Sequence, residues 1–142
     1  MSRGFVKEDD LEHAGTDLPE RPLSPHVNYV TPQGLQQLQL ALKTLEAQRI
    51  THASKKEAPD AQQKLAEIDR DIRYIAARLE SALLVDPAQQ PRGSVLFGAS
   101  VTVEDETGEQ YVFRIVGEDE ADIAAGKVSY VSPLAKALLG KK

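Results

Sequence analysis

The stretch LAEIDRDIRYIAARL, residues 65–79, carries an aliphatic side chain at every third or fourth position. Those side chains are Leu65, Ile68, Ile72, Ile75 and Leu79. Spacings that alternate between three and four keep them on one face of an α-helix, which is the pattern of a coiled-coil seam. The stretch therefore predicts a long helix that buries one narrow stripe against a partner.

An earlier segment supplies the matching stripe. It begins at Thr31–Pro32, where the threonine suits a helix N-cap and the proline suits the first helical position. One antiparallel register pairs the two stripes throughout, because the residue numbers of each pair have the same total: Leu45 with Ile72, Leu42 with Ile75, Leu38 with Leu79, and Leu35 with Ala82. We expect a helical hairpin with roughly 26 residues per arm, which is about 40 Å long.

The register puts the apex of this hairpin between Ala58 and Pro59. Glu57 and Asp60 are the acids that flank it. One interpretation is a solvated, charged turn. A second is a tip that offers carboxylates to a metal ion, although the neighbouring residues Lys55 and Lys56 would repel a cation. A third is a contact of these acids with another protein.

The composition excludes several classes of function. The 142 residues carry a net charge of −5, so we expect no strong direct binding to DNA. There is no cysteine, and the three histidines lack the spacing of metal ligands. The sequence shows neither a signal peptide nor an apolar run of about 20 residues, so we expect no membrane contact and a cytoplasmic location.

The remaining segments predict an α+β fold with three parts: an extended or disordered tail over 1–29, the hairpin over 30–86, and a β-rich domain over 87–142. The tail is rich in proline and acids. In the last part, SVLFGASVTVED and EQYVFRIVG predict two strands joined by a turn at DETG. KVSYVSP predicts a third strand of a small antiparallel sheet, and a short helix follows, closed by Gly140.

Four stretches of the sequence resemble the bacterial transcription elongation factors GreA and GreB. They are YVTPQGLQQLQ (29–39), EIDRDIRYIAARLESALLVD (67–86), GSVLFGASVTVEDETGEQYVFRIVGEDEAD (93–122) and KVSYVSPLAKALLGKK (127–142). The resemblance implies an FKBP-like C-terminal domain, which would be incomplete here because the family continues with a further β-hairpin after LLGKK. It also implies a factor that binds RNA polymerase at its secondary channel and modulates elongation.

The resemblance further implies roles for particular residues. Ser132, Pro133, Asp119 and Glu120 fall in the region that meets the polymerase in this family. Glu57 and Asp60 take the place of the acids at the family's hairpin tip, which help the polymerase to hold Mg²⁺ while it cleaves backtracked RNA. Such a protein is no enzyme itself and has no cofactor of its own, because it lends carboxylates to the Mg²⁺ of the polymerase.

Two alternatives follow from the same residues. The family's Gly-Asp-x-Ser-Glu-Asn-Ala tip is replaced by THASKKEAPDAQQ (51–63), and the arms are shorter by about two turns, or roughly 10 Å. A non-catalytic regulator that competes with other factors for the channel is therefore the first alternative. The second is a prolyl isomerase, which rests on fold analogy alone, since the aromatics Tyr111, Phe113 and Tyr130 are few for such a pocket.

Overall fold

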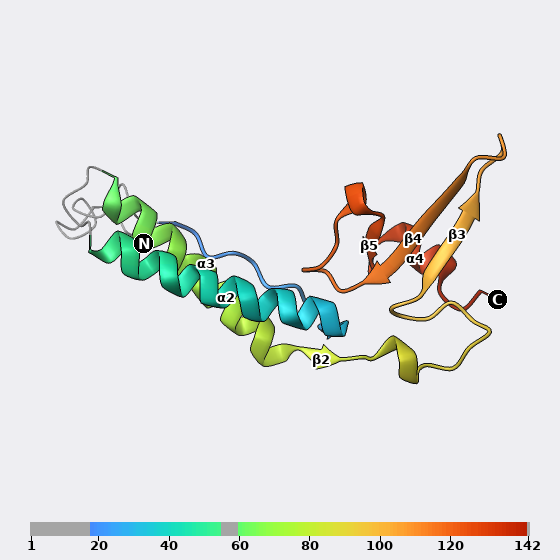
Figure 1. The fold of residues 1–142 in the computed structure, drawn as a ribbon, viewed down its shortest axis with the longest axis horizontal. Coiled ribbons are helices and arrows are strands. Elements are labelled where there is room, and N and C mark those ends of the chain that lie inside the picture. Colours follow the sequence, from blue (N-terminus) through green and yellow to red (C-terminus); the bar gives the residue numbers. More distant parts are fainter. Residues whose placement is uncertain (1–17, 55–59, 142) are drawn as a thin grey trace, which may run out of the picture. The chain divides into compact units, whose positions relative to one another are not determined.

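The computed structural model describes residues 18–54 and 60–141, and it divides into two compact units (Figure 1). Of the described residues, the first unit holds 18–23, 41–54 and 60–77, which include parts of two long helices. The second unit consists of Ser24–Leu40 and Arg78–Lys142. The predicted apex at Ala58 and Pro59 lies outside the described residues.

The two long helices are α2, Pro32–Ala53, and α3, Ala61–Ser81. α2 begins where the sequence predicts, because the backbone N–H of Gly34 donates to Thr31 Oγ1 over 3.0 Å and so satisfies one free amide of the first turn. With 22 and 21 residues, the helices are about 33 and 32 Å long, somewhat shorter than the predicted arms. They lie side by side and run in opposite directions (Figure 1).

The burial of the helices follows the predicted seam. Every residue of the two aliphatic stripes is buried or half-buried, and Leu38, Ile68 and Ile75 are the most enclosed. Leu40 and Ile50 fall outside the stripes and are 65% and 72% exposed. Across the helices, Arg49 Nε donates to Asp69 Oδ1 over 2.6 Å, which fits the predicted register to within one residue. The antiparallel hairpin is thus confirmed.

The second unit begins with a pair of very short strands. β1, Tyr29–Val30, pairs in parallel with β2, Leu83–Leu84, immediately before α2 and immediately after α3. Gly117 follows the later strand β4 at a point where the carbonyl of Tyr29 occupies the space of a side chain, so only glycine fits there without a shift.

The β-rich part forms a three-stranded sheet with the order β3-β4-β5. β3, Ser100–Glu104, and β4, Gln110–Val116, are antiparallel around the predicted DETG turn. β5, Lys127–Ser129, is parallel to β4, so the sheet is mixed rather than wholly antiparallel. The chain returns through residues 117–126 to the level of Arg114 in β4, and this return makes the parallel pairing of β5 with Arg114–Val116 possible. The α+β class is confirmed.

The core of this part lies between one face of the sheet and α4, Pro133–Leu138 (Figure 1). Ile115, Val128 and Ala135 are buried at its centre, and partly buried side chains surround them: Val95, Phe97, Val101, Phe113, Tyr130, Leu134, Leu138 and Leu139. Gly140, with φ +86°, follows the helix as predicted. No helix among the described residues is both long and apolar enough to cross a membrane.

Candidate functional site

The two acids expected at the hairpin tip differ in what the structure says of them. Glu57 lies outside the described residues. Asp60 is exposed immediately before α3, and its backbone carbonyl accepts from the N–H of Lys64 over 3.0 Å. Its side chain therefore stands at the first turn of the helix, open to solvent. Within residues 18–54 and 60–141, no group of three or more acidic or histidine side chains forms a metal site.

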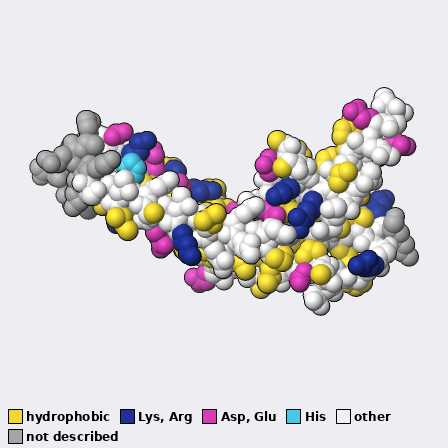
Figure 2. All heavy atoms as spheres, in the orientation of Figure 1, with side chains coloured by type: hydrophobic (Ala, Val, Ile, Leu, Met, Phe, Trp, Pro, Cys, Tyr) yellow, Lys and Arg dark blue, Asp and Glu magenta, His cyan; other side chains and the backbone are white. Residues whose placement is uncertain are grey.

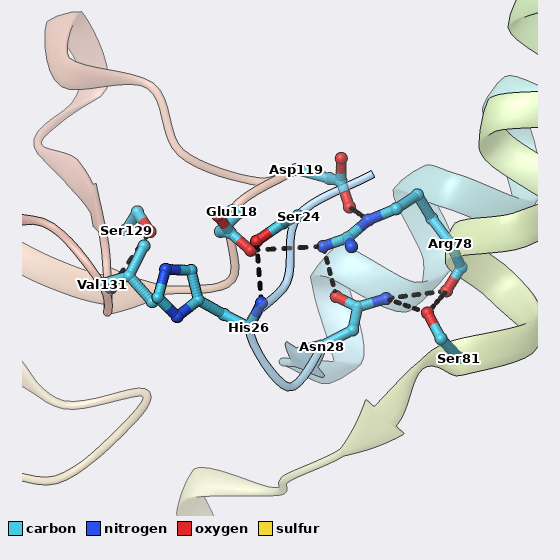
Figure 3. A network of polar contacts seen from close by, with 9 residues as sticks. All are labelled: Ser24, His26, Asn28, Arg78, Ser81, Glu118, Asp119, Ser129 and Val131. Carbon is cyan, nitrogen blue, oxygen red and sulfur yellow. Dashed lines mark hydrogen bonds and ion pairs between the residues drawn. The ribbon is translucent and has the colours of Figure 1, made fainter. Parts of the chain in front are cut away.

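The other predicted acids meet the base of the hairpin. Arg78, the residue before the last seam leucine, is 2% exposed, and its Nε donates to Asp119 Oδ2 over 2.5 Å (Figure 3). A second guanidinium nitrogen lies 3.7 Å from Glu118 Oε2. The buried cation is thus paired with carboxylates, as a charge in an apolar surrounding must be.

Asn28 connects the same arginine to the segment before β1. Its Oδ1 accepts from Arg78 over 2.8 Å, while its Nδ2 donates to the backbone carbonyl of Arg78 over 2.7 Å and to Ser81 Oγ over 3.2 Å (Figure 3). Both ends of the amide are therefore used. Because that carbonyl lies in the last turn of α3, Asn28 also satisfies an acceptor near the helix end.

Glu120 is the second acid that meets the hairpin base, at the start of α2. Its Oε1 accepts from Thr31 Oγ1 over 2.5 Å, and Lys127 Nζ lies 3.8 Å from its other oxygen. A Cβ on Gly34 would come within 2.7 Å of Glu120 Oε1, so the glycine leaves the room that the carboxylate occupies. The carboxylate therefore lies at the N-terminus of α2, where the helix dipole favours negative charge.

These contacts form one arrangement, which we call the base network: Asn28, Thr31, Arg78, Asp119 and Glu120. Its members come from the two ends of the hairpin and from the loop after β4, all within the second unit. The sequence identified Asp119 and Glu120 as surface residues for a partner, but Glu120 is 6% exposed and both carboxylates already have internal partners. Their contact with the polymerase stays a prediction.

Ser132 and Pro133 occupy the start of α4. Ser132 Oγ accepts from the N–H of Ala135 over 3.2 Å, and Pro133 takes the first helical position. The pair therefore begins a helix, which is the structural role that the sequence suggests for a serine followed by proline. Pro133 is exposed and Ser132 half-exposed, so a further role in partner contact also stays a prediction.

The tail makes contacts that sequence reasoning did not identify. Glu20 accepts two hydrogen bonds from the Arg73 guanidinium on α3, over 2.7 and 2.6 Å. These bonds hold the pKa of Glu20 below its usual value and raise the pKa of Arg73. Arg21 lies over the ring of Tyr74, with its guanidinium carbon 3.7 Å from the ring centre. The alternation of acids and arginines on α3 was the available signal for these contacts.

The visible face of the molecule shows no broad region of one charge. Acidic and basic side chains are interspersed along the helices and over the β-rich part (Figure 2).

Comparison with known proteins identifies the family. The family model described as "Transcription elongation factor, GreA/GreB, C-term" matches residues 90–142. Transcription elongation factor GreB of Yersinia pestis is 40% identical over 129 residues, which cover 81% of this chain and 75% of that protein. The chain belongs to the GreA/GreB family. Transcription elongation factor GreA of Psychrobacter arcticus is also 40% identical, over 79% of this chain and 81% of that protein.

Solved structures that resemble this GreA/GreB chain include the transcription factor Gfh1, at 23% identity and a TM-score of 0.41 over 84% of this chain and 85% of that one. The base network lies partly within the region that the GreA/GreB C-terminal model matches, since Asp119 and Glu120 fall inside residues 90–142. Asn28, Thr31 and Arg78 precede that region.

Proposed function

We propose that this GreA/GreB chain binds RNA polymerase through its C-terminal β-rich domain and inserts the helical hairpin into the secondary channel to modulate elongation. The supporting observation is the combination of family membership with two long antiparallel helices, α2 and α3, whose aliphatic stripes are buried or half-buried. A packed antiparallel pair of helices is stiff enough to act as a probe, whereas two separate helices of this length are not.

The chain acts in this proposal as a regulator and not as an enzyme. Asp60 offers an exposed carboxylate beside the end of the hairpin. A carboxylate is a hard oxygen ligand of the kind that Mg²⁺ prefers, but Mg²⁺ requires about six ligands in octahedral geometry. One or two tip carboxylates therefore supply part of such a shell, and the polymerase supplies the rest together with the reacting RNA.

A second candidate function is regulation without cleavage. The family's tip motif is absent, and Lys55 and Lys56 stand beside the acids. A hairpin of this kind would occupy the channel and compete with other channel factors or with the entry of nucleotides. It would not bring a second metal ion to the active centre, because the lysines disfavour a nearby cation.

Transcript cleavage in stalled elongation complexes tests both candidates. The wild-type chain, a Glu57→Ala/Asp60→Ala variant, and a Glu46→Ala control on the exposed side of α2 are compared for polymerase affinity and for RNA cleavage. If the tip assists cleavage, the wild type and the Glu46→Ala control stimulate RNA cleavage and the double variant does not, while all three bind the polymerase with the same affinity. Regulation without cleavage predicts inhibition of elongation that all three proteins share. Failure of the wild-type chain to bind core RNA polymerase contradicts the proposed function in both forms.

A further inference from the structure

Residues 18–23, which we call the strap, run beside the pair of long helices (Figure 1). A groove lies between the strap and α3. Its volume is about 200 Å³, and its lining comes from the strap and from two turns of the helix: Glu20, Arg21, Leu23, Arg70, Arg73, Tyr74 and Ala77. This space remains although the strap is in place. The strap therefore follows the surface of α3 without filling it.

The polar part of this surface recognises a carboxylate. Arg73 Nε donates to Glu20 Oε1, and one terminal guanidinium nitrogen of Arg73 donates to Glu20 Oε2. These two parallel bonds have the fork geometry that matches the two oxygens of a carboxylate. Arg70 Nε donates to Asp71, which in turn accepts from Arg21 of the strap over 3.3 Å. The surface thus specifies an acidic residue and, next to it, a cationic one.

The apolar part of the surface is only partly used. Tyr74 is covered by the guanidinium of Arg21, whereas Leu23 remains 56% exposed at the edge of the groove. Pro19 and Pro22 restrict the backbone of the strap to extended conformations, so little entropy is lost when it lies along the helix. A ligand with the same backbone and a larger apolar side chain beside Tyr74 and Ala77 would bury more surface.

The strap is held in a way that permits exchange. The side chains of Glu20 and Arg73 are 59% and 57% exposed, and that of Arg21 is 41% exposed. Exposed ion pairs of this kind contribute little free energy, so docking rests on the high local concentration that the covalent link provides. A ligand in solution can therefore displace the strap.

We propose that this face of α3 is a recognition site for an extended, proline-containing segment of a partner protein that carries an acidic residue next to a cationic one, and that the strap occupies the site as an intramolecular competitor. The partner segment places a carboxylate on Arg73 and an apolar side chain in the groove beside Tyr74. The proposal goes beyond the proposed function and rests on it in one respect, namely that RNA polymerase carries the segment.

Peptide binding tests the groove without polymerase. The ¹⁵N-labelled full chain is titrated with the octapeptide LPERPLSP, the sequence of residues 18–25, while the amide signals of Tyr74 and Ala77 are followed. A Glu20→Ala/Arg21→Ala variant, which releases the strap, is expected to bind the peptide about tenfold more tightly than the wild type does. The matched control, Lys43→Ala/Glu46→Ala on the exposed side of α2, is expected to bind as the wild type does.

A charge reversal makes the peptide test specific. Arg73→Glu is expected to abolish binding of LPERPLSP and to accept a peptide in which arginine replaces the glutamate. Equal affinities for the wild type and the strap-released variant overturn the proposal, and so does binding that is indifferent to Arg73→Glu. Because each variant changes exposed side chains only, a retained far-UV circular dichroism spectrum is expected throughout.

Affinity for core RNA polymerase tests the choice of partner. The Glu20→Ala/Arg21→Ala variant is expected to bind the polymerase several-fold more tightly than the wild type and the α2 control. Unchanged or weaker binding overturns the assignment of the polymerase as the partner. If none of the three proteins binds the polymerase, the proposed function has failed. The peptide titration then still decides whether the groove binds such a segment.

Discussion

The carboxylate of Glu120 occupies the space that a side chain on Gly34 would need, with 2.7 Å between Oε1 and the position of a Cβ. The same oxygen accepts from Thr31, the N-cap of α2. A residue of the loop after β4 thus completes the start of a helix that precedes it by more than eighty residues. The hydroxyl of Thr31 links the loop to the helix, because it accepts from the N–H of Gly34 and donates to the buried carboxylate of Glu120.

Gly34→Ala tests this relationship, because its expected effect on the free energy of unfolding has the opposite sign to the usual effect of this substitution in a helix. Alanine in place of glycine in a helix ordinarily stabilises by roughly 1 kcal/mol. Here we expect destabilisation, since the methyl group displaces a carboxylate that is buried and held by Thr31. In a Glu120→Ala background the same change is expected to stabilise. Urea unfolding of the four proteins gives the coupling, and a stabilising Gly34→Ala in the wild type contradicts the packing described here.

Arg78→Ala removes the cation of the base network. The Arg78 side chain is 3% exposed and pairs with Asp119, so its loss takes the guanidinium away from a carboxylate that is only 15% exposed and removes the donor to Asn28 Oδ1. We expect the free energy of unfolding to fall by about 3–5 kcal/mol. Arg92→Ala, which changes an exposed arginine of the same unit, serves as the control and is expected to shift stability by less than about 0.5 kcal/mol. A shift for Arg78→Ala as small as that of the control would show that the base network does not contribute to the free energy of unfolding.

The hairpin seam predicts a contrast between two isoleucines. Ile68 is 7% exposed in the seam, whereas Ile50 is 72% exposed outside it. Ile68→Ala leaves a cavity and is expected to cost about 2–5 kcal/mol in unfolding free energy. Ile50→Ala is expected to cost close to nothing, because its side chain gains little from folding. Similar losses at both positions, measured by thermal and urea unfolding, would refute the register.

The seam was predictable from sequence because helical periodicity is a local property that ten aliphatic residues repeat. The same holds for the DETG turn and for the Ser132–Pro133 start of α4, where the residue types suit one backbone conformation. Each of these elements needs only its own neighbours to be defined.

The base network could not be predicted in the same way. GEDEAD, residues 117–122, is an acidic loop whose composition is typical of a solvated segment. The side chain of Asp119 in this loop pairs with the buried Arg78. Arg78 precedes the seam residue Leu79, and the helical periodicity does not predict its burial. The parallel pairing of β5 is equally non-local, since a strand of three residues carries no mark of its direction.

Acidification is expected to release the strap. The hydrogen bonds from Arg73 lower the pKa of Glu20 below its usual value of 4.5. A carboxyl group whose pKa is lowered in the bound form stabilises that form above its ordinary pKa, and the stabilisation is lost as the pH falls through the lowered value. The amide signals of Tyr74 and Ala77 should therefore move toward those of the Glu20→Ala/Arg21→Ala variant between about pH 5 and pH 3. In that variant the same signals should not show this transition, and a transition of equal size there would assign it to another group.

Alkaline conditions are expected to destabilise the second unit through Tyr130. Burial raises the pKa of its hydroxyl above the usual value of 10.0, and the carboxylate of Glu118 adds to the effect. Above pH 10 the unfolded chain releases this proton while the folded chain retains it, so the free energy of unfolding falls as the pH rises. Tyr130→Phe should keep the ring contacts with Tyr29 and Phe97, whose centres lie 5.4 and 5.6 Å away, and remove this part of the pH dependence.

Urea unfolding between pH 8 and pH 11 measures the effect of Tyr130. The wild type and Tyr130→Phe are expected to have similar stability at pH 8, and the variant should lose less as the pH approaches 11. Tyr111 also has a raised pKa, because its hydroxyl donates to Asp105, so Tyr111→Phe is measured beside it. The Tyr111 ring is 40% exposed. Removal of its solvated hydroxyl should therefore change the pH dependence of the free energy of unfolding less than Tyr130→Phe does. Parallel curves for the wild type and Tyr130→Phe would show that the Tyr130 hydroxyl reaches solvent in the folded chain.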